Sequence, residues 1–318
     1  NGGIINSYGS NAKLGQGDWA VIESDESDGS FIQIFPTIAI VTNIDREHLY
    51  YYGSFDNLKR AFKIFLSNLP FFGMGIVCID DSGVQSIIRD IKDRKILTYG
   101  LTNLANVQAI NIRKSNEGSI FNIKYNQHMI HDIYIPLFGD HNIRNALSIV
   151  ALSIVLKVEV DIIKAMLANF SGVKRRFTTV GYINNVLVVD DYAHHPTEIR
   201  SALIAAKQKK PGQLVVVHQP HRFRRLNQLF NEFCTCFDLA DTIIIVPVYK
   251  ADDIESAPLD SIDLYENIRE RNKDAYYAED KKKLKQILMN IAKQLSNNDI
   301  IIFTGAGDIS QWAYEIVS

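Results

Sequence analysis

Short apolar runs alternate with stretches of helical hydrophobic spacing along most of the chain. Residues 38–44 and 75–80 are apolar, β-rich runs bounded by polar turn residues, which predicts strands. Between them, apolar side chains recur at helical spacing over residues 54–68, with Ser54 as the expected N-cap. This order predicts two parallel strands joined by a crossover helix. Residues 19–23 carry a similar strand-like pattern, and we predict a strand there too.

The pattern changes over residues 104–136 and then returns to helices. Apolar and polar residues alternate in three stretches separated by turn residues, namely 107–113, 119–125 and 129–135. Such a series predicts a small antiparallel meander. Helical spacing follows at residues 142–156 and 160–169.

Strands and helices alternate again from about Arg176. The predicted strands of this second half cover residues 186–189, 214–217, 242–246 and 300–303, with helices between them. The turn at residues 170–174 is the predicted boundary between a domain 1–172 and a domain 173–318. The predicted fold class is α/β, with a mostly parallel first sheet that carries the meander.

Composition agrees with this picture and excludes several classes of protein. A chain of 318 residues favours two domains, and 47% apolar with 22% charged residues is ordinary for a soluble globular protein. The net charge of −2 argues against a nucleic-acid partner, and no apolar run approaches the roughly 20 residues that membrane insertion requires. The cysteines form no C-x-x-C pair, which favours reduced thiols in the cytoplasm.

Polar side chains are dense at two predicted strand-to-helix junctions of the second half. Residues 190–198 bring two acids, a phenol and two imidazoles, and residues 219–225 bring a second dense group. Ligands bind at the carboxyl ends of parallel strands. Tyr192 and His194 can therefore contact a substrate. Arg222 and Arg225 lie three apart on an emerging helix, where they can meet a carboxylate or a developing oxyanion.

The first half offers candidates that have plainer alternatives. Glu23 opens an acidic run, 23–28, whose oxygens suit Mg²⁺, although a solvated acidic turn is equally compatible. His48 would lie near Glu23 if the two preceding strands are neighbours, and otherwise is an ordinary surface histidine. Asn142 and Asn145 share a helix face and can read a purine edge. Capping of the helix, by Asp140 or His141 among others, is the alternative there.

Absent motifs and one basic run narrow the chemistry further. Residues 174–176 include Arg176, which can clamp a phosphate, and a solvated linker is the alternative. No Gly-Lys dipeptide occurs, so the chain has no Walker-type P-loop, and no G-x-S-x-G occurs either. Residues 194–195 lack the further Cys or His of a tetrahedral zinc site.

Taken in order, the motifs resemble those of the Mur ligases along the whole chain. They are E-S-D-E-S-D-G-S-F at 23–31, T-N-I at 42–44, N-L-P-F-F-G at 68–73, G-D-H-N-I-R-N-A-L at 139–147, G-V-K-R-R-F at 172–177, D-D-Y-A-H-H-P-T-E at 190–198 and Q-P-H-R-F at 219–223. The resemblance implies that residues 1–172 are the later part of a central ATPase domain. It implies that residues 173–318 are a Rossmann-like C-terminal domain. The N-terminal domain and the P-loop would then precede Asn1.

The resemblance also implies an activity. It is closest to the members that join L-alanine to UDP-N-acetylmuramate with ATP and Mg²⁺, through an acyl phosphate, in cytoplasmic peptidoglycan precursor synthesis. Cell-wall biogenesis, cell shape and cell division depend on that step, and such a protein would be a monomer or a homodimer. A muropeptide-recycling ligase of the same family is one alternative, against which the 23–28 run argues. A non-catalytic nucleotide-binding remnant is the other.

Residue roles carry over by position in the motifs. The resemblance assigns metal binding to Glu23 and His48, ATP binding to Asn142, Asn145, Arg176 and Asp191, and the amino-acid and acyl-phosphate site to Tyr192, His194, Arg222 and Arg225. Of the last group, it makes His194, Arg222 and Arg225 catalytic. This chain departs from the family at Tyr50, where an aspartate is usual, at Ala193, where glycine is usual, and at residues 226–227, where Thr-Arg often stands.

A polypeptide of residues 1–318 alone is expected to be inactive, because it has no P-loop to hold the phosphates of ATP. The measurement is ADP release by the purified polypeptide with UDP-N-acetylmuramate, L-alanine and ATP. Ligation above the background without enzyme would contradict the expectation.

Overall fold

The computed structural model describes residues 2–251, 253, 258–271 and 274–318, and these form two compact units. One unit comprises Gly2 and Asn11–Ser171, and the other comprises Gly3–Ser10 and Gly172–Ser318. The N-terminal segment thus departs from the continuous domain 1–172 that we predicted. It joins the second unit because Ile5 forms a β-bridge with Val173 and the Lys174 N–H donates to the Ile4 carbonyl at 2.9 Å.

The sheet of the first unit has its strands in sequence order. These are β1 (Ile38–Val41), β2 (Met74–Cys78), β3 (Lys95–Gly100), β4 (Val107–Lys114), β5 (Ser119–Tyr125) and β6 (His128–Ile135). The pairs from β1 to β4 are parallel, and the pairs β4–β5 and β5–β6 are antiparallel. The predicted parallel sheet with an antiparallel meander is therefore confirmed.

Helices of the first unit lie between its strands and after the last of them. They are α1 (Leu49–Tyr52), α2 (Phe55–Ser67), α3 (Ser82–Ile88), α4 (Asp140–Val155) and α5 (Val160–Ala168), with the 3-10 turn η1 (Ser30–Gln33). The Ser54 side chain accepts a hydrogen bond from the Asn57 N–H at 3.2 Å, as expected of the N-cap of α2. Helix α2 buries Leu58, Phe65 and Leu66 toward the core.

The strand predicted at residues 19–23 is wrong. In the described structure these residues lie outside any strand, and Trp19 and Val21 are 56% and 88% exposed. Their β-branched and aromatic composition favours a strand locally. An extended segment nevertheless becomes a strand only when a neighbouring backbone pairs with it and its side chains find a surface to pack on.

The sheet of the second unit interleaves distant strands, in the order β11-β10-β9-β12-β8-β7. The strands are β7 (Thr178–Ile183), β8 (Val186–Asp191), β9 (Leu214–His218), β10 (Thr242–Ile245), β11 (Asp274–Tyr277) and β12 (Ile300–Thr304). All pairs are parallel except β7–β8. The four strands predicted for this half all form, whereas β7 and β11, like β3 in the first unit, were not predicted.

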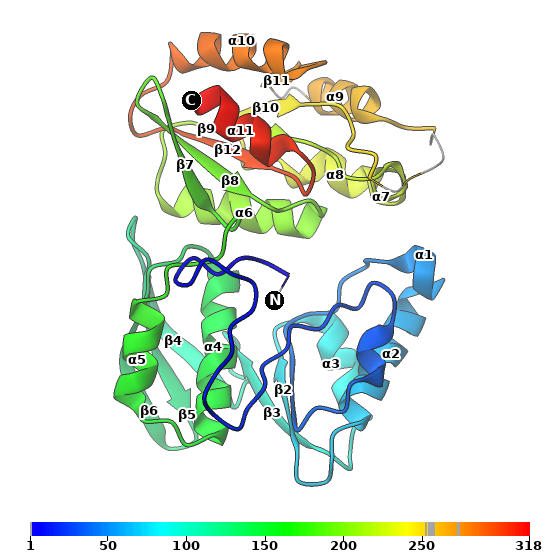
Figure 1. The fold of residues 1–318 in the computed structure, drawn as a ribbon, viewed down its shortest axis with the longest axis vertical. Coiled ribbons are helices and arrows are strands. Elements are labelled where there is room, and N and C mark those ends of the chain that lie inside the picture. The colour runs from blue at the N-terminus through cyan, green and yellow to red at the C-terminus, as the bar shows by residue number, and fades with distance from the viewer. Residues whose placement is uncertain (1, 252, 254–257, 272–273) are drawn as a thin grey trace. The chain divides into compact units, whose positions relative to one another are not determined.

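Helices cover both faces of the second sheet (Figure 1). They are α6 (Pro196–Gln208), α7 (Phe223–Gln228), α8 (Phe230–Cys236), α9 (Ser261–Glu270), α10 (Lys281–Ala292) and α11 (Ile309–Val317). Strands β9 and β12 are buried along their whole length, which explains why their sequences are continuous apolar runs. The arrangement is the Rossmann-like layering expected for this half.

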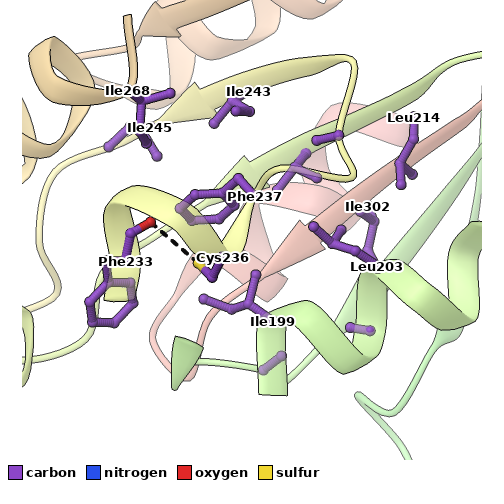
Figure 2. Close-up of a cluster of buried hydrophobic side chains, with 14 of the residues drawn as sticks. Ile199, Leu203, Leu214, Phe233, Cys236, Phe237, Ile243, Ile245, Ile268 and Ile302 are labelled. Atoms are coloured by element: carbon purple, nitrogen blue, oxygen red, sulfur yellow. Dashed lines mark hydrogen bonds between the residues drawn. The ribbon is translucent and has the colours of Figure 1, made fainter. Parts of the chain in front are cut away.

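Figure 2 shows one of the two cores of this unit. Phe233 and Phe237 from the α8 region lie over strand residues such as Ile243 and Ile302, with Leu203 of α6 beside them. Phe237 is 1% exposed. The apolar area that such a ring buries contributes strongly to the stability of the folded unit, which an exposed ring does not do.

Phe237→Ala should lower the free energy of unfolding of the second unit by about 3–5 kcal/mol, because it removes buried ring atoms and leaves a cavity. Urea denaturation followed by circular dichroism measures the change. The matched control is Tyr182→Ala, whose ring is 62% exposed on β7. Equal losses in the two variants would contradict the assignment of Phe237 to the core.

Candidate active site

Parallel register brings four loops of the second unit to one edge of its sheet. Thr304 pairs with Asp191 on one side and with His218 on the other, and His218 pairs with Ile245. The segments that follow β8, β9, β10 and β12 therefore all leave from the same carboxyl edge, where ligands of open α/β sheets bind.

Asp191 anchors the loop after β8. Its two carboxylate oxygens accept hydrogen bonds from the N–H groups of Ala193 and Phe177, both at 2.9 Å. The side chain is buried, and burial raises the pKa of Asp191 to about 6, against the opposing effects of these bonds and of Arg176. Both oxygens are thus engaged with the backbone, and the carboxylate fixes the shape of the turn that presents Tyr192.

Asp190 plays a related part beneath the loop after β12. It is fully buried, and one carboxylate oxygen accepts from the Ser310 hydroxyl at 2.6 Å and lies 3.7 Å from Arg175 Nε. Burial raises the pKa of Asp190, against the Ser310 bond and the Arg175 charge. The Arg175 guanidinium in turn donates to the carbonyl of Gly305 at 2.6 Å. The loops after β8 and β12 are therefore tied together.

Two arginines flank Tyr192. The guanidinium carbons of Arg175 and Arg176 lie 4.9 Å and 5.5 Å from the centre of its ring. Cations over an aromatic face are attracted by its quadrupole. The Arg176 side chain is 55% exposed and its Nη1 lies 3.9 Å from Glu198 Oε1, so it keeps a positive charge at the rim of this edge.

His194 and His195 have different roles although they are adjacent. His195 is the N-cap of α6 and forms a capping box with Glu198. His194 directs its Nδ1 to the Tyr192 carbonyl at 3.0 Å, and its ring centre lies 5.8 Å from that of His221. His194 is therefore the imidazole that meets the second loop.

The loop after β9 carries His221 and the two predicted arginines. Arg225 Nη1 lies 3.2 Å from both the carbonyl and Nδ1 of His221. Because guanidinium can only donate, Nδ1 accepts and the neutral ring carries its proton on Nε2. Burial, followed by the charge of Arg225, lowers the pKa of His221 to about 4. The ring is thus a neutral hydrogen-bond donor near pH 7.

Tyr249, after β10, is a site residue that sequence reasoning missed. Its ring stacks on that of His221 with centres 5.5 Å apart. Its carbonyl accepts from the Arg222 N–H at 2.9 Å, and Arg222 has a left-handed φ of 66°. Its place in the sequence could have indicated it, because Tyr249 follows a predicted strand, as the polar motifs at 190–198 and 219–225 do.

The structure thus brings Asp191, Tyr192, His194, Arg222 and Arg225 to one edge of the second sheet. Of the predicted residues of the first unit, Asn142 and Asn145 share α4, whereas Glu23 and His48 lie on other segments. Glu23 follows no strand, contrary to expectation, and its carboxylate accepts from the Gly2 N–H at 2.6 Å.

His48 contacts a different acid from the one expected. Its Nε2 lies 3.7 Å from Glu26 Oε1, and its Nδ1 lies 3.3 Å from the Tyr50 hydroxyl. Burial raises the pKa of Glu26, against the effects of its own backbone hydrogen bond and of His48. Tyr50, which stands where the family has an aspartate, therefore supplies the hydrogen-bond partner of this ring. Within the described ranges, no group of three or more His, Cys, Asp or Glu side chains is placed to hold a metal ion.

Asn142 and Asn145 lie in the first turns of α4, but the expected caps are wrong. Gly139 is the N-cap, without a side-chain bond, and Asp140 is already helical and pairs with Lys114 at 2.6 Å. The Asn142 side chain donates to the Phe138 carbonyl at 2.8 Å, a contact with the backbone at the helix start of the kind that the capping alternative implies. Asn145 is exposed.

Sequence comparison places the two halves in one family. Residues 9–153 match the Mur ligase middle domain, and residues 175–307 match the Mur ligase, glutamate ligase domain. The chain is 43% identical to the UDP-N-acetylmuramate–L-alanine ligase of Brucella anthropi, over 99% of this chain and 68% of that protein. It is also 43% identical to the enzyme of the same name from Mesorhizobium japonicum, over 99% and 69%.

Solved structures agree with these relatives. The UDP-N-acetylmuramate–alanine ligase of Thermotoga maritima aligns with a TM-score of 0.80 and 27% identity, over 99% of this chain and 67% of that chain. A MurF structure from Acinetobacter baumannii, at 20% identity and a TM-score of 0.74, shares the fold. Among the described residues, no helix has the length and apolarity needed to cross a membrane.

His218 gives the second unit a defined pH dependence. Burial lowers its pKa from 6.5 to about 3, so the unfolded chain binds the proton more tightly than the folded one. The free energy of unfolding should therefore fall as the pH drops below the unfolded value, by about 1.4 kcal/mol per pH unit from this group. His218→Phe should remove this contribution to the pH dependence of the free energy of unfolding. Urea titrations at a series of pH values between 6.5 and about 3 measure it.

Asp191→Asn is the control, because Asp191 changes stability with pH in the opposite direction to His218. The pKa of Asp191 is raised from 3.8 to about 6, so the folded state holds this proton more tightly, and stability falls as the pH rises between these values. Removing the carboxyl should make the acid-side loss of stability steeper than in the parent protein. If the free energy of unfolding of His218→Phe changed with pH as steeply as that of the parent protein, the attribution of this pH dependence to His218 would be wrong.

Proposed function

The chain belongs to the Mur ligase family, and we propose that the protein joins L-alanine to UDP-N-acetylmuramate with the hydrolysis of ATP to ADP and phosphate. The observation that carries the proposal is the grouping of Tyr192, His194, His221, Arg222 and Arg225 at the carboxyl edge of the second sheet. Relatives that bear this enzyme's name cover nearly the whole chain, which spans about two thirds of their length.

The proposed reaction has two steps. A carboxylate oxygen of UDP-N-acetylmuramate attacks the γ-phosphorus of ATP, the bond to the β–γ bridging oxygen breaks, and ADP leaves. The amine of L-alanine then attacks the carbonyl carbon of the acyl phosphate, phosphate leaves with the electrons of the C–O bond, and one N–H proton of the amine passes to the departing phosphate. Catalysis of phosphoryl transfer depends mainly on positioning and on neutralising charge.

Arg222 and Arg225 are proposed to stabilise the negative charge of the second step. The tetrahedral intermediate carries an oxyanion beside a phosphate, and preorganised cations lower its energy most when they are fixed in advance. Arg225 is fixed by its contacts with His221, and the Arg222 backbone is fixed by Tyr249. The neutral His221, with its proton on Nε2, adds a donor and no further positive charge.

Nucleotide binding is proposed for Asn142, Asn145, Arg176 and Asp191. The exposed Asn145 amide can pair with a purine edge, and the exposed guanidinium of Arg176 can pair with phosphate. A direct contact of Asp191 with ATP stays a prediction. Its burial and its two backbone partners favour a role in holding the turn that carries Tyr192.

Mg²⁺ is proposed as the companion of ATP. Magnesium prefers oxygen ligands, so the Glu23 carboxylate suits it better than the His48 imidazole does. When bound, the ion would neutralise phosphate charge. Because His48 faces Glu26, the residues in the described ranges do not by themselves complete a metal site, and the phosphates of ATP would supply further oxygens.

The proposed reaction places the protein in the cytoplasm, where it would act as a monomer or a homodimer. Its product would feed peptidoglycan precursor synthesis, and hence cell-wall growth, cell shape and division. The substrates contain a nucleotide, but no nucleic acid takes part.

The test uses protein expressed from the complete coding sequence and measures L-alanine-dependent ADP release with UDP-N-acetylmuramate. Arg222→Ala and Arg225→Ala should each lower kcat by about a hundredfold or more, because each removes a cation from the developing oxyanion.

Arg224→Ala is the matched control for this test. That side chain lies in the same turn but pairs with Asp253, with Nε 3.7 Å from a carboxylate oxygen, and its variant should keep near-parental activity. Absence of L-alanine-dependent ADP release by the parent protein would overturn the proposal. Turnover with a peptide in place of L-alanine would instead favour a muropeptide-recycling ligase.

A further inference from the structure

The Nδ1 atom of His194 lies between two hydrogen-bond acceptors. The Tyr192 carbonyl oxygen is 3.0 Å away, and Glu198 Oε2 is 3.2 Å away. Neither a carbonyl nor a carboxylate can donate a hydrogen bond. A lone pair on Nδ1 would face two negative oxygens, so the proton of the neutral ring resides on Nδ1 and the lone pair on Nε2.

Glu198 is itself held firmly. The same Oε2 accepts from the N–H groups of His194 and His195, at 3.0 Å and 3.3 Å, as part of the capping box of α6. Its other oxygen lies 3.9 Å from Arg176 Nη1. The carboxylate therefore keeps one orientation relative to the ring, which is what a group that orients an imidazole requires.

We propose that Glu198 is a positioning residue that holds His194 in the Nδ1–H form, with Nε2 ready to accept a proton from the ammonium group of the amino-acid substrate. The identity of that substrate rests on the function proposed above. The N–H bond of the ammonium breaks, its electron pair stays on the amine nitrogen, and the proton passes to Nε2. The free amine then attacks the acyl phosphate, and Glu198 stabilises the imidazolium that has formed.

The other groups that face His194 favour this role. The ring of Tyr192 lies 5.1 Å away and that of His221 lies 5.8 Å away, centre to centre. Burial, followed by the charge of His194, keeps the pKa of His218 low, and His221 is also neutral near pH 7. Among the described contacts of His194, Glu198 is an anion at 3.2 Å from Nδ1, and the two neighbouring imidazoles bring no positive charge near pH 7.

A purely structural role, as the N3 acid of a capping box, is the competing explanation. The chain offers a matched case in α9, where the Asp263 carboxylate accepts from the N–H of its N-cap, Asp260, at 2.7 Å. That box has an aspartate where α6 has His195, and it lies in the same unit. Asp263→Asn therefore measures the loss of a capping acid alone.

The experiment compares Glu198→Gln with Asp263→Asn by long-range ¹H–¹⁵N NMR of histidine side chains. The His194 signals are assigned by their loss in His194→Asn. In the parent protein the neutral His194 ring should show the Nδ1–H pattern. Glu198→Gln should move the midpoint of its titration to lower pH by about one pH unit, because a neighbouring negative charge is gone. Asp263→Asn should leave the midpoint in place.

Two results would overturn the proposal: an Nε2–H pattern in the parent protein, or a His194 titration that Glu198→Gln leaves unchanged. Because the NMR measurement needs no turnover, it stands even if the proposed ligation fails. In that case only the assignment of the substrate falls.

In an active protein, Glu198→Gln should lower kcat about tenfold near neutral pH and leave the KM for ATP unchanged, because proton transfer contributes to the rate and not to nucleotide binding. A loss confined to the KM for ATP would assign Glu198 to the nucleotide site instead.

Discussion

A buried carboxylate, that of Asp191, is the interaction on which the candidate site depends most. Removing a carboxylate from water is costly, and two backbone N–H bonds offset part of that cost. These bonds also fix the direction in which the chain leaves β8. The Asp191 carbonyl accepts from the Gly305 N–H at 3.2 Å, so the loop after β12 is set by the same residue. Tyr192 and His194 are presented from a turn that has few alternative shapes.

Charge is distributed unevenly around this edge of the sheet. His218 and His221 are kept neutral by burial, whereas Arg175, Arg176, Arg222 and Arg225 contribute guanidinium cations. Neutral imidazoles beside fixed cations provide hydrogen bonds without adding to the repulsion among the arginines. An edge of this kind suits anionic substrates and intermediates. Proton transfer is left to His194, the imidazole that has the carboxylate of Glu198 beside it.

Tyr50 shows how a departure from a family pattern can retain a local interaction. A phenol cannot replace a carboxylate as a charge, yet its hydroxyl reaches His48 Nδ1 at 3.3 Å. Glu26 lies against the other nitrogen of the ring. The histidine thus has a partner on each side, although neither is the residue that the motif led us to expect.

Local pattern alone determined much of this protein. Burial on both faces makes β9 and β12 continuous apolar runs, alternation marks the meander β4–β6, and Ser54 caps α2, so these elements were predictable. Motif order identified the family and placed Tyr192, His194, Arg222 and Arg225 after strands. Pattern failed at residues 19–23, because strand formation requires a pairing partner that local sequence does not specify. Only the tertiary structure could show that Tyr249 stacks on His221, that Glu26 meets His48, and that Glu198 faces His194. The first two contacts join residues far apart in the chain, whose proximity spacing does not encode, whereas His194 and Glu198 are four residues apart and meet because of the turn that precedes α6.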